Sequence, residues 1–301
     1  MKRKNIISTI AMLAVTLMVS GCSGLTGGSD SSTEDTAIRV GSKDFTENLV
    51  VSEIYALALE DAGYEVERIP NIASSVIHTS ITNDEIDLYP EYTGTGLLVV
   101  LEMEMETDPQ KVYDTIKAEY DEQFDLTWLD YAEANDSAGL VIKTSVAEKY
   151  GIETVSDLQE HATELRFASQ GEFDQREDGL PGLTKAYGEF NWKSSTVYDS
   201  LKYEVLKNDE ADVAPAYTTE GQLTDKEEFT VLVDDRNFWP PYNLAPVIRN
   251  EVLEENPKIA EILNNISSTL DTETVTGLNA KVDVDGQEYE AVAKEYFDSI
   301  K

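Results

Sequence analysis

The sequence contains only one cysteine and two histidines among its 301 residues. A lone Cys22 cannot form a disulfide within the chain, so stability has to come from packed cores. His78 and His161 are far apart and have no companion cysteine, which argues against a metal site and favours helix-surface or packing roles. There is no GxxxxGK[ST] phosphate loop and no GxSxG nucleophile elbow. We therefore predict no metal, no cofactor and no serine-histidine catalysis.

Basic residues are also scarce. The chain has 23 Lys and Arg and 59 Asp and Glu, which give a formal net charge of −36. Such a surface repels nucleic acid and anionic lipid, so no phosphate-backbone partner is expected. The acidity is interpreted as an aid to solubility, with a saline habitat as one explanation and an acidic docking face as another. Paired-carboxylate hydrolase chemistry stays open on counting alone, although no pair stands out.

The chain begins with the pattern of a signal peptide. A basic head, MKRK, is followed by the apolar run Ile6–Val19 and by small residues. The run is shorter than the ~20 residues that an apolar helix needs to cross a bilayer. We predict a signal peptide over residues 1–21. Loss of its three basic residues changes the formal net charge from −36 to −39.

Cys22 follows this segment directly. The preceding Val19-Ser20-Gly21 resembles the lipobox of bacterial lipoproteins, in which the cysteine becomes the lipidated first residue. Lipidation accounts for the one cysteine better than a buried structural role does. Residues 22–36 are rich in Gly, Ser, Thr and acid and are predicted to form a lipidated flexible tether. The mature protein is then expected on the extracytoplasmic face of the cell membrane, held by its lipid.

Strand and helix patterns alternate from Ala37 onward. In the first half, Asp44 and Glu47 have the spacing of a capping box that opens a helix. The predicted elements are strands at 38–40, 64–69 and 86–88, a helix from residue 44 that stops at Gly63, and a helix at 76–81. A βαβαβ order of this kind predicts a parallel sheet.

The second half shows the same alternation. Strands are predicted at 139–143, 165–168, 212–214 and 229–233, and helices at 144–150, after a cap at Ser156, at 183–187 and at 200–206. From Asn250 the chain is predicted to be mostly helical. The length beyond the tether suits two α/β lobes of ordinary domain size.

The chain contains an internal repeat of thirteen residues. Residues 84–96 read DEIDLYPEYTGTG and residues 209–221 read DEADVAPAYTTEG, with seven of thirteen aligned positions identical. Tyr92 and Tyr217 are expected in loops directly after equivalent strands of the two lobes. Because ligands of open α/β sheets bind beyond the carboxyl ends of the strands, we predict that these rings face a shared cleft. The alternative is that both rings serve as core or hinge packing.

Six stretches between residues 41 and 249 resemble, in the family's order, the substrate-binding proteins of ABC importers for quaternary-ammonium osmoprotectants such as glycine betaine, choline and carnitine. They are GSKDFTENLVVSEIYALALEDAGYEVER, EIDLYPEYTGTGLL, VAEKYGIETVSDL, EFDQREDGLPGL, ADVAPAYTTEGQL and FWPPYNLAPVIR. The resemblance implies an α/β, two-lobed type II periplasmic-binding-protein fold with a central ligand cleft. Lobe 1 would comprise residues 37–136 and 243–301, and lobe 2 residues 137–242.

The resemblance also implies a site. A trimethylammonium group cannot donate a hydrogen bond, so it is recognised by aromatic faces, each worth roughly 0.5 to 2 kcal/mol. Tyr92 of YPEYTGT, Tyr217 of AYTT and Tyr242 of PPYN correspond to rings of the family's tyrosine cage. Arg176 of EFxxRxDG is expected to meet the carboxylate of a betaine through its forked donors.

Polar residues beside the predicted cleft are further candidates. Asp44, Thr46, Asn48 and Thr95 lie on loops or helix starts, where they either contact the ligand or cap helices. Asn48 and Thr95 are retained as predicted ligand-binding residues.

One position departs from the family pattern. Where relatives read NNTYAL or NDTYAL, residues 135–140 of this chain read NDSAGL, so Ala138 stands where a fourth cage tyrosine belongs. Two explanations stay open. Either a neighbour such as Tyr131 or Trp239 completes the wall, or the ligand is bulkier or is not a simple trimethylammonium compound.

We therefore predict an extracytoplasmic solute-binding lipoprotein, a monomer and not an enzyme, that captures a quaternary-ammonium solute and delivers it to an ABC permease with a separate ATPase. Its lobes would close by a hinge near residues 134–140 and 237–246. The alternative keeps the fold and binds a different small amine or betaine-like solute. A hydrolase would turn over sugars or esters, and an adhesin would bind host polymers. Glycine betaine, choline, carnitine and proline betaine are not ranked by the sequence.

Overall fold

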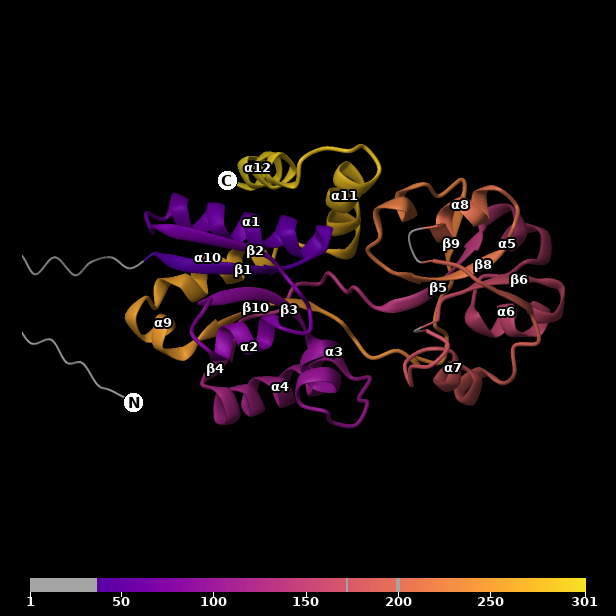
Figure 1. Ribbon diagram of the computed structural model, residues 1–301, viewed down its shortest axis with the longest axis horizontal. Helices are drawn as coiled ribbons and strands as arrows, with labels where there is room; N and C mark the ends of the chain where they lie inside the picture. The colour runs from indigo at the N-terminus through magenta and orange to yellow at the C-terminus, as the bar shows by residue number, and fades with distance from the viewer. Residues whose placement is uncertain (1–36, 172, 199–200) are drawn as a thin grey trace, which may run out of the picture. The chain divides into compact units, whose positions relative to one another are not determined.

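The computed structural model describes residues 37–171, 173–198 and 201–301. The predicted signal peptide and tether, with Cys22, lie outside the described residues. Two five-stranded sheets organise the described part, and helices pack on both (Figure 1). We call each sheet with its helices a lobe. The α/β, two-lobed prediction is confirmed.

Sheet 1 has the strand order β2-β1-β3-β10-β4. Its strands are β1 (Ile38–Lys43), β2 (Val66–Ile72), β3 (Leu88–Tyr92), β4 (Leu126–Trp128) and β10 (Leu244–Arg249). β1 pairs in parallel with β2 and β3, as the βαβαβ pattern predicts. β10 runs antiparallel to β3 and β4, so the sheet as a whole is mixed rather than parallel.

Sheet 2 repeats this arrangement, with the order β7-β6-β8-β5-β9. Its strands are β5 (Ala138–Lys143), β6 (Arg166–Ser169), β7 (Lys193–Thr196), β8 (Val213–Tyr217) and β9 (Phe229–Val231). β6 pairs in parallel with β7 and β8, and β5 runs antiparallel to β8 and β9. In each sheet the one antiparallel strand, β5 or β10, lies next to an edge strand and is the first strand that the chain forms after leaving the other lobe.

Helices cover both faces of each sheet. In lobe 1 they are α1 (Thr46–Asp61), α2 (Ile77–Thr82), α3 (Thr93–Thr95), the π-helical turn η1 (Gly96–Val100), α4 (Pro109–Phe124), α9 (Asn250–Glu255), α10 (Lys258–Ser267), α11 (Thr272–Asp283) and α12 (Tyr289–Ile300). In lobe 2 they are α5 (Thr144–Tyr150), α6 (Val155–His161), α7 (Leu180–Tyr187), α8 (Lys202–Lys207) and the short 3₁₀ turns η2 (Ala162–Glu164) and η4 (Gly221–Thr224).

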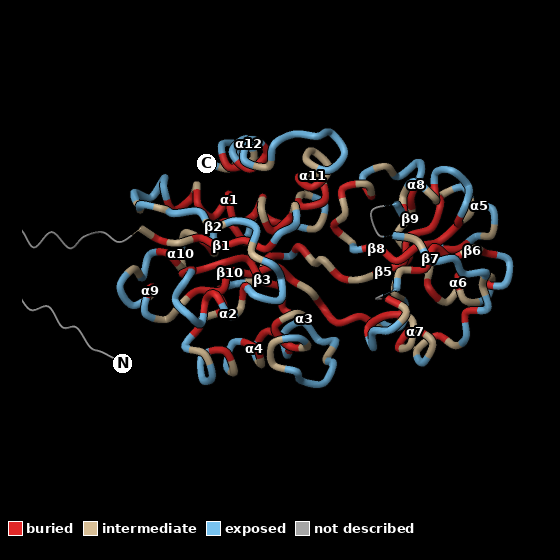
Figure 2. Tube along the Cα trace, in the orientation of Figure 1, coloured by how far each residue is buried: buried red, intermediate tan, exposed pale blue. Residues whose placement is uncertain are grey.

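The strands of sheet 1 divide the core of lobe 1 into two layers (Figure 2). Leu244 and Ile248 of β10 pack with α1, α10, α11 and α12, whereas Ala245 and Val247 pack with α2 and α4. Successive strand residues point to opposite faces, so the single strand β10 contributes side chains to both layers. Sheet 2 behaves likewise, with α5, α6 and α7 on one face and α8 on the other.

Two predicted helix caps are wrong. Phe45 is the N-cap of α1 and makes no side-chain cap hydrogen bond. The side chain of Glu47 does not fold back on the helix start, because it accepts the hydrogen bond of a buried tyrosine hydroxyl. In α6 the capping box is made by Thr154 with Asp157, while the Ser156 hydroxyl donates to Asp235 at 2.7 Å.

The repeated DExD has a structural explanation that the sequence did not reveal. In lobe 1 the Arg39 backbone N–H and Nε donate to Asp87 Oδ2 at 2.8 and 3.1 Å, and Nη1 donates to the carbonyl of Asp84. Asp84 has a φ of 60°, in the left-handed region that aspartate tolerates better than most residues. The carbonyl of Asp84 and the carboxylate of Asp87 thus fix a turn and fasten the start of β3 to β1.

Lobe 2 contains the same device. The Arg166 backbone N–H and Nε donate to Asp212 Oδ2 at 2.8 and 2.9 Å, and Nη1 donates to the carbonyl of Asp209. Asp209 has a φ of 57°. The first half of the repeat therefore serves the scaffold, and only its second half leads toward the cleft.

Candidate ligand-binding site

The second half of the repeat places two tyrosines at equivalent points. Tyr92 is the last residue of β3 and is paired with Leu244, and Tyr217 is the last residue of β8 and is paired with Ala138. The strands extend through Pro90 and Pro215, so the rings project from strand ends rather than from the loops that the sequence predicts. Both rings still lie at the carboxyl ends of their strands.

A cavity of about 720 Å³ is lined by residues of both lobes, and we call it the interlobe cavity. Five of the six predicted ligand-binding residues line it: Tyr92, Thr95, Arg176, Tyr217 and Tyr242. Its remaining lining residues are Lys43, Phe45, Thr46, Glu47, Ser74, Ser75, Val99, Asp136, Ala138, Asp178, Lys202, Tyr203, Thr219, Glu220, Gln222, Asn279 and Asp283.

The three tyrosines differ in their surroundings. Tyr92 is buried and its hydroxyl donates to Glu47 Oε1 at 2.9 Å. The Tyr242 hydroxyl donates to Asp178 Oδ2 at 3.2 Å. Burial raises the pKa of both phenols, and the neighbouring carboxylates raise these pKa values further, so both rings are neutral near neutral pH. Tyr217 is 45% exposed and is the most open ring of the three.

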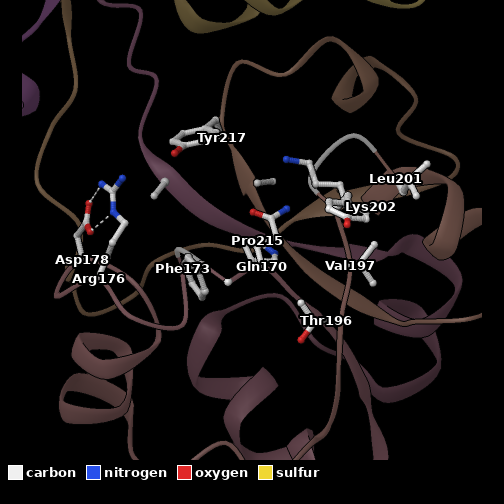
Figure 3. A pocket seen from close by; sticks show the side chains of 14 residues that line it. Gln170, Phe173, Arg176, Asp178, Thr196, Val197, Leu201, Lys202, Pro215 and Tyr217 are labelled. Carbon is white, nitrogen blue, oxygen red and sulfur yellow. Dashed lines mark hydrogen bonds and ion pairs between the residues drawn. The ribbon is translucent and has the colours of Figure 1, made fainter. Parts of the chain in front are cut away.

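Arg176 reaches the cavity as one half of an ion pair (Figure 3). Its Nε donates to Asp178 Oδ1 at 2.7 Å and its Nη2 to Asp178 Oδ2. Burial opposes ionisation of Asp178, yet the Arg176 hydrogen bonds and charge outweigh it and lower the Asp178 pKa. Within the part of the chain that the structure describes, Nη1 of Arg176 has no hydrogen-bond partner, which leaves one edge of the guanidinium for a ligand carboxylate.

Asn48, the sixth predicted residue, does not line the cavity. It is fully buried; its side-chain oxygen accepts from the Lys43 backbone N–H at 2.6 Å, and its amide donates to the Pro90 carbonyl at 2.8 Å. These bonds tie the end of β1 to β3. Asn48 therefore supports the wall that carries Lys43, and its direct ligand contact stays a prediction.

Neither residue suggested as a substitute for the fourth cage tyrosine lines the cavity. Tyr131 packs edge-on against Tyr113 with ring centroids 5.0 Å apart. Trp239 is 7% exposed and donates its indole N–H to the Asp178 carbonyl at 2.8 Å. Neither Tyr131 nor Trp239 therefore closes the cavity wall at Ala138. Two aromatic lining residues were missed by the sequence reasoning: Phe45, whose ring lies 6.0 Å from that of Tyr92, and Tyr203.

Two carboxyl groups in the cavity wall were also missed as site residues. Glu47 Oε2 accepts from Asn279 at 3.1 Å, and Asp136 Oδ1 accepts from Thr219 at 2.6 Å. Burial raises the pKa of Glu47 despite these donors. Burial, with the Glu47 charge as the next cause, raises the Asp136 pKa well above its usual range. A signal existed for Glu47, which lies in the quoted FTENL, but no pattern pointed to Asn279.

The lining of the interlobe cavity has more acidic than basic groups. Five carboxyl residues stand against Lys43, Arg176 and Lys202. Both lysines are themselves paired with carboxylates, Lys43 with Glu91 and Lys202 with Glu220. The Lys43 ammonium also lies 5.1 Å from the centroid of the Tyr92 ring. Because two of the five carboxyl groups have raised pKa values and two others are paired with cations, the preference for a positively charged group rests on the aromatic rings.

Two features are absent from the described residues, which are 37–301 without 172 and 199–200. In them no cluster of three or more His, Cys, Asp or Glu residues could hold a metal ion. Over the same residues, no helix has the length and apolar character needed to cross a membrane.

Comparisons with known proteins place this geometry in a family. Residues 36–299 match the family model of the substrate binding domain of the ABC-type glycine betaine transport system. The carnitine transport binding protein OpuCC of Listeria monocytogenes is 33% identical over 304 residues, covering 98% of this chain and 96% of that protein. A solved structure of a glycine betaine/carnitine/choline ABC transporter has 28% identity and a TM-score of 0.81, covering 87% of this chain and 98% of that one.

A third relative is a larger protein. The ergothioneine transport permease/ergothioneine binding protein EgtU of Helicobacter pylori is 32% identical over 271 residues, which cover 89% of this chain and 48% of that protein. The chain thus spans about half the length of this relative. The family consists of substrate-binding proteins of ABC importers and not of enzymes, so the chain is the extracytoplasmic solute-binding component of such an importer. The chain belongs to the family of substrate-binding domains of ABC-type glycine betaine transport systems.

Proposed function

We propose that this protein captures a small quaternary-ammonium solute, such as glycine betaine, choline or carnitine, in the interlobe cavity and delivers it to an ABC permease. The observation that carries the proposal is the convergence of Tyr92, Tyr217 and Tyr242 on one cavity. These residues come from both lobes, so only a ligand held between the lobes contacts all of them. The names of the family and of the OpuCC relative support the same ligand class.

The chemistry of the cavity suits this class. A trimethylammonium group is weakly hydrated and gains from the negative faces of aromatic rings by roughly 0.5 to 2 kcal/mol each. The phenol hydroxyls of Tyr92 and Tyr242 donate to carboxylates, which makes the rings richer in electrons. A betaine or carnitine carboxylate would bind the open edge of Arg176, whereas choline would leave that edge to water.

Ligand capture is proposed to close the lobes. Lobe 1 would be residues 37–136 with 243–301, and lobe 2 residues 137–242, with a hinge near 134–140 and 237–246. The two crossings are held together, because Asp136 N–H donates to the Tyr242 carbonyl at 3.0 Å and Leu244 N–H to the Ala134 carbonyl at 3.1 Å. Asn279 adds a further link, since its amide donates to the Thr219 carbonyl at 2.8 Å. Closure would turn about these bonds.

The remaining parts of the proposal concern the membrane and the partners. Cys22 would carry the lipid that tethers the protein beside its permease, and a separate ATPase would supply the energy of import. The protein would act as a monomer. Mass spectrometry of protein from membranes tests the anchor, since a lipid on Cys22 should disappear in a Cys22→Ala variant.

Isothermal titration of the protein begun at Ser23 tests the ligand class with glycine betaine, choline, carnitine and proline betaine. Tyr217→Ala should weaken binding about fivefold to thirtyfold. Tyr150→Ala is the matched control, because Tyr150 ends α5 outside the cavity lining and should bind like the unaltered protein. Absence of heat with all four ligands would overturn the proposed function.

A further inference from the structure

A second cavity of about 910 Å³ lies in lobe 2, and we call it the lobe-2 cavity (Figure 3). It shares Ala138, Arg176, Asp178, Lys202 and Tyr217 with the interlobe cavity. Both volumes lie in the ~300 to 1,000 Å³ range of pockets that enclose drug-sized ligands. Glycine betaine is far smaller than such a ligand, so the combined space exceeds what a minimal osmolyte needs.

Ala138 stands where the two cavities meet. It begins β5 directly opposite Tyr217 on β8, and side chains at such positions have Cβ atoms about 5 Å apart. Its methyl group is too short to cover the boundary, whereas a tyrosine there would set a second ring beside Tyr217 and close it. The equivalent position of lobe 1 is filled by Leu244, which is buried opposite Tyr92. The opening is therefore specific to lobe 2.

The chemistry of the lobe-2 cavity differs from that of the tyrosine cage. Phe173, Val197 and Pro215 supply apolar surface, and Gln170 and Thr196 supply an amide and a hydroxyl. Figure 3 shows Phe173, Gln170 and Pro215 between the Arg176–Asp178 pair and Leu201. A ring or a heteroatom-bearing arm suits this mixture better than a purely alkyl chain does.

The residues that the two cavities share determine which group of a ligand lies in which cavity. Tyr217 offers its face to a trimethylammonium group, and the open edge of Arg176 suits a carboxylate. In a betaine of an α-amino acid both groups sit on one carbon, and the third substituent of that carbon is the amino-acid side chain. When the trimethylammonium group lies at Tyr217 and the carboxylate at Arg176, the amino-acid side chain extends past Ala138 into the lobe-2 cavity.

Resting on the proposed function, we propose that the site is selective for betaines of α-amino acids with ring-bearing side chains, and that the lobe-2 cavity is the subsite for the side chain. Ala138 is the residue that determines this specificity. The trimethylammonium and carboxylate groups bind as in glycine betaine, and the ring supplies the additional contact area.

Titration of the protein begun at Ser23 with glycine betaine, phenylalanine betaine and histidine betaine tests the subsite. At least one of the two ring-bearing betaines should bind ten times tighter than glycine betaine or better. Free phenylalanine and histidine serve as controls, and they should bind at least a hundredfold more weakly because they lack the trimethyl group. Ala138→Tyr should weaken the ring-bearing betaines at least tenfold and should not weaken glycine betaine, because the added ring completes the tyrosine cage.

Leu201→Trp provides a variant that leaves the cage untouched, since Leu201 lines the lobe-2 cavity only and is 41% exposed. It should weaken the ring-bearing betaines and leave glycine betaine unchanged. Glycine betaine binding as tightly as both larger betaines would overturn the subsite alone. Equal weakening of all three ligands by both variants would do the same. Absence of heat with every quaternary-ammonium compound would overturn the proposed function, and the subsite with it.

Discussion

The two lobes share a scaffold and differ at the edge that faces the ligand. Both sheets have the same strand order, and in both an arginine is hydrogen-bonded to the aspartates of DExD. At the opposite end of the repeat, Tyr92 is buried against Glu47 and Phe45, while Tyr217 is half exposed beside Ala138. Lobe 1 therefore presents a fixed wall and lobe 2 an open one. The repeat supplies the common scaffold and one tyrosine in each lobe, whereas residues outside it, Glu47 in lobe 1 and Ala138 in lobe 2, make the two walls differ.

The largest expected effect concerns the scaffold. Asp212 is buried and Arg166 is its only ion-pair partner in the described residues, whereas Asp87 is paired with both Arg39 and Arg249. Removing the partner of a buried charge is costly, so Arg166→Ala should lower the free energy of unfolding by about 2 to 3 kcal/mol, a value reduced for the partial exposure of Arg166.

Arg39→Ala should cost about 1 kcal/mol less, because Arg249 still compensates Asp87. Denaturant unfolding of both variants measures the difference. Equal losses in the two lobes would show that the second arginine of lobe 1 contributes nothing. Titration with glycine betaine should give unchanged affinity for both variants, as expected of residues that lie away from the cavity.

The next effect concerns the open wall. Tyr217→Ala should weaken binding of a quaternary-ammonium ligand by about 1 to 2 kcal/mol, because an exposed ring loses its cation contact and little else. The free energy of unfolding should change by less than about 1 kcal/mol, since the ring is half exposed. Isothermal titration and thermal unfolding together check this. A large loss of stability with unchanged affinity would make Tyr217 a packing residue.

A smaller effect concerns the joint between the lobes. Asp136 and Glu47 both have pKa values raised by burial, and Asp136 also faces Thr219 and the charge of Glu220. The folded state therefore binds more protons than the unfolded state above the ordinary carboxyl pKa. These groups stabilise the fold at low pH, and that contribution is lost as pH rises through their folded-state pKa values.

Asp136→Asn should therefore stabilise the protein by about 1 kcal/mol at pH 8 and by less at pH 4.5. Thermal unfolding at the two pH values measures this change. Asp130→Asn removes one charge at an exposed position and serves as the control, which should stabilise the protein at pH 8 by less than Asp136→Asn does. Destabilisation by Asp136→Asn at pH 8 would mean that its charge is needed in the fold.

The smallest effect concerns the fixed wall. Tyr92→Phe removes the hydroxyl that donates to Glu47 but keeps the ring. Binding should weaken by about 0.5 kcal/mol or less, because the aromatic face is retained and the electron-donating hydrogen bond is only a secondary gain. Titration of Tyr92→Phe beside Tyr242→Phe checks this. A tenfold loss in either variant would assign a direct ligand contact to the hydroxyl.

Local patterns in the sequence were enough to predict most of the alternating strands and helices, the Gly151 stop of α5 and the placement of Tyr92 and Tyr217. They did not predict β4, β7, β10 or α4, and Tyr242 was predicted from the family resemblance. Long-range pairing was beyond them. The antiparallel direction of β5 and β10 depends on how the chain returns from the other lobe, and Glu47 was read as a cap because its true partners, Tyr92 and Asn279, are distant in sequence. Asn279 lies in a helix without any motif.

The central claim is that the interlobe cavity recognises a positive charge by its rings. Titration with glycine betaine and with 3,3-dimethylbutanoate, in which a neutral tert-butyl group replaces trimethylammonium, tests this directly. The two ligands have nearly the same shape and the same carboxylate. The account predicts that glycine betaine binds at least tenfold tighter, and that this preference shrinks in Tyr217→Ala. Equal affinities would contradict it, because shape and the carboxylate alone would then account for binding.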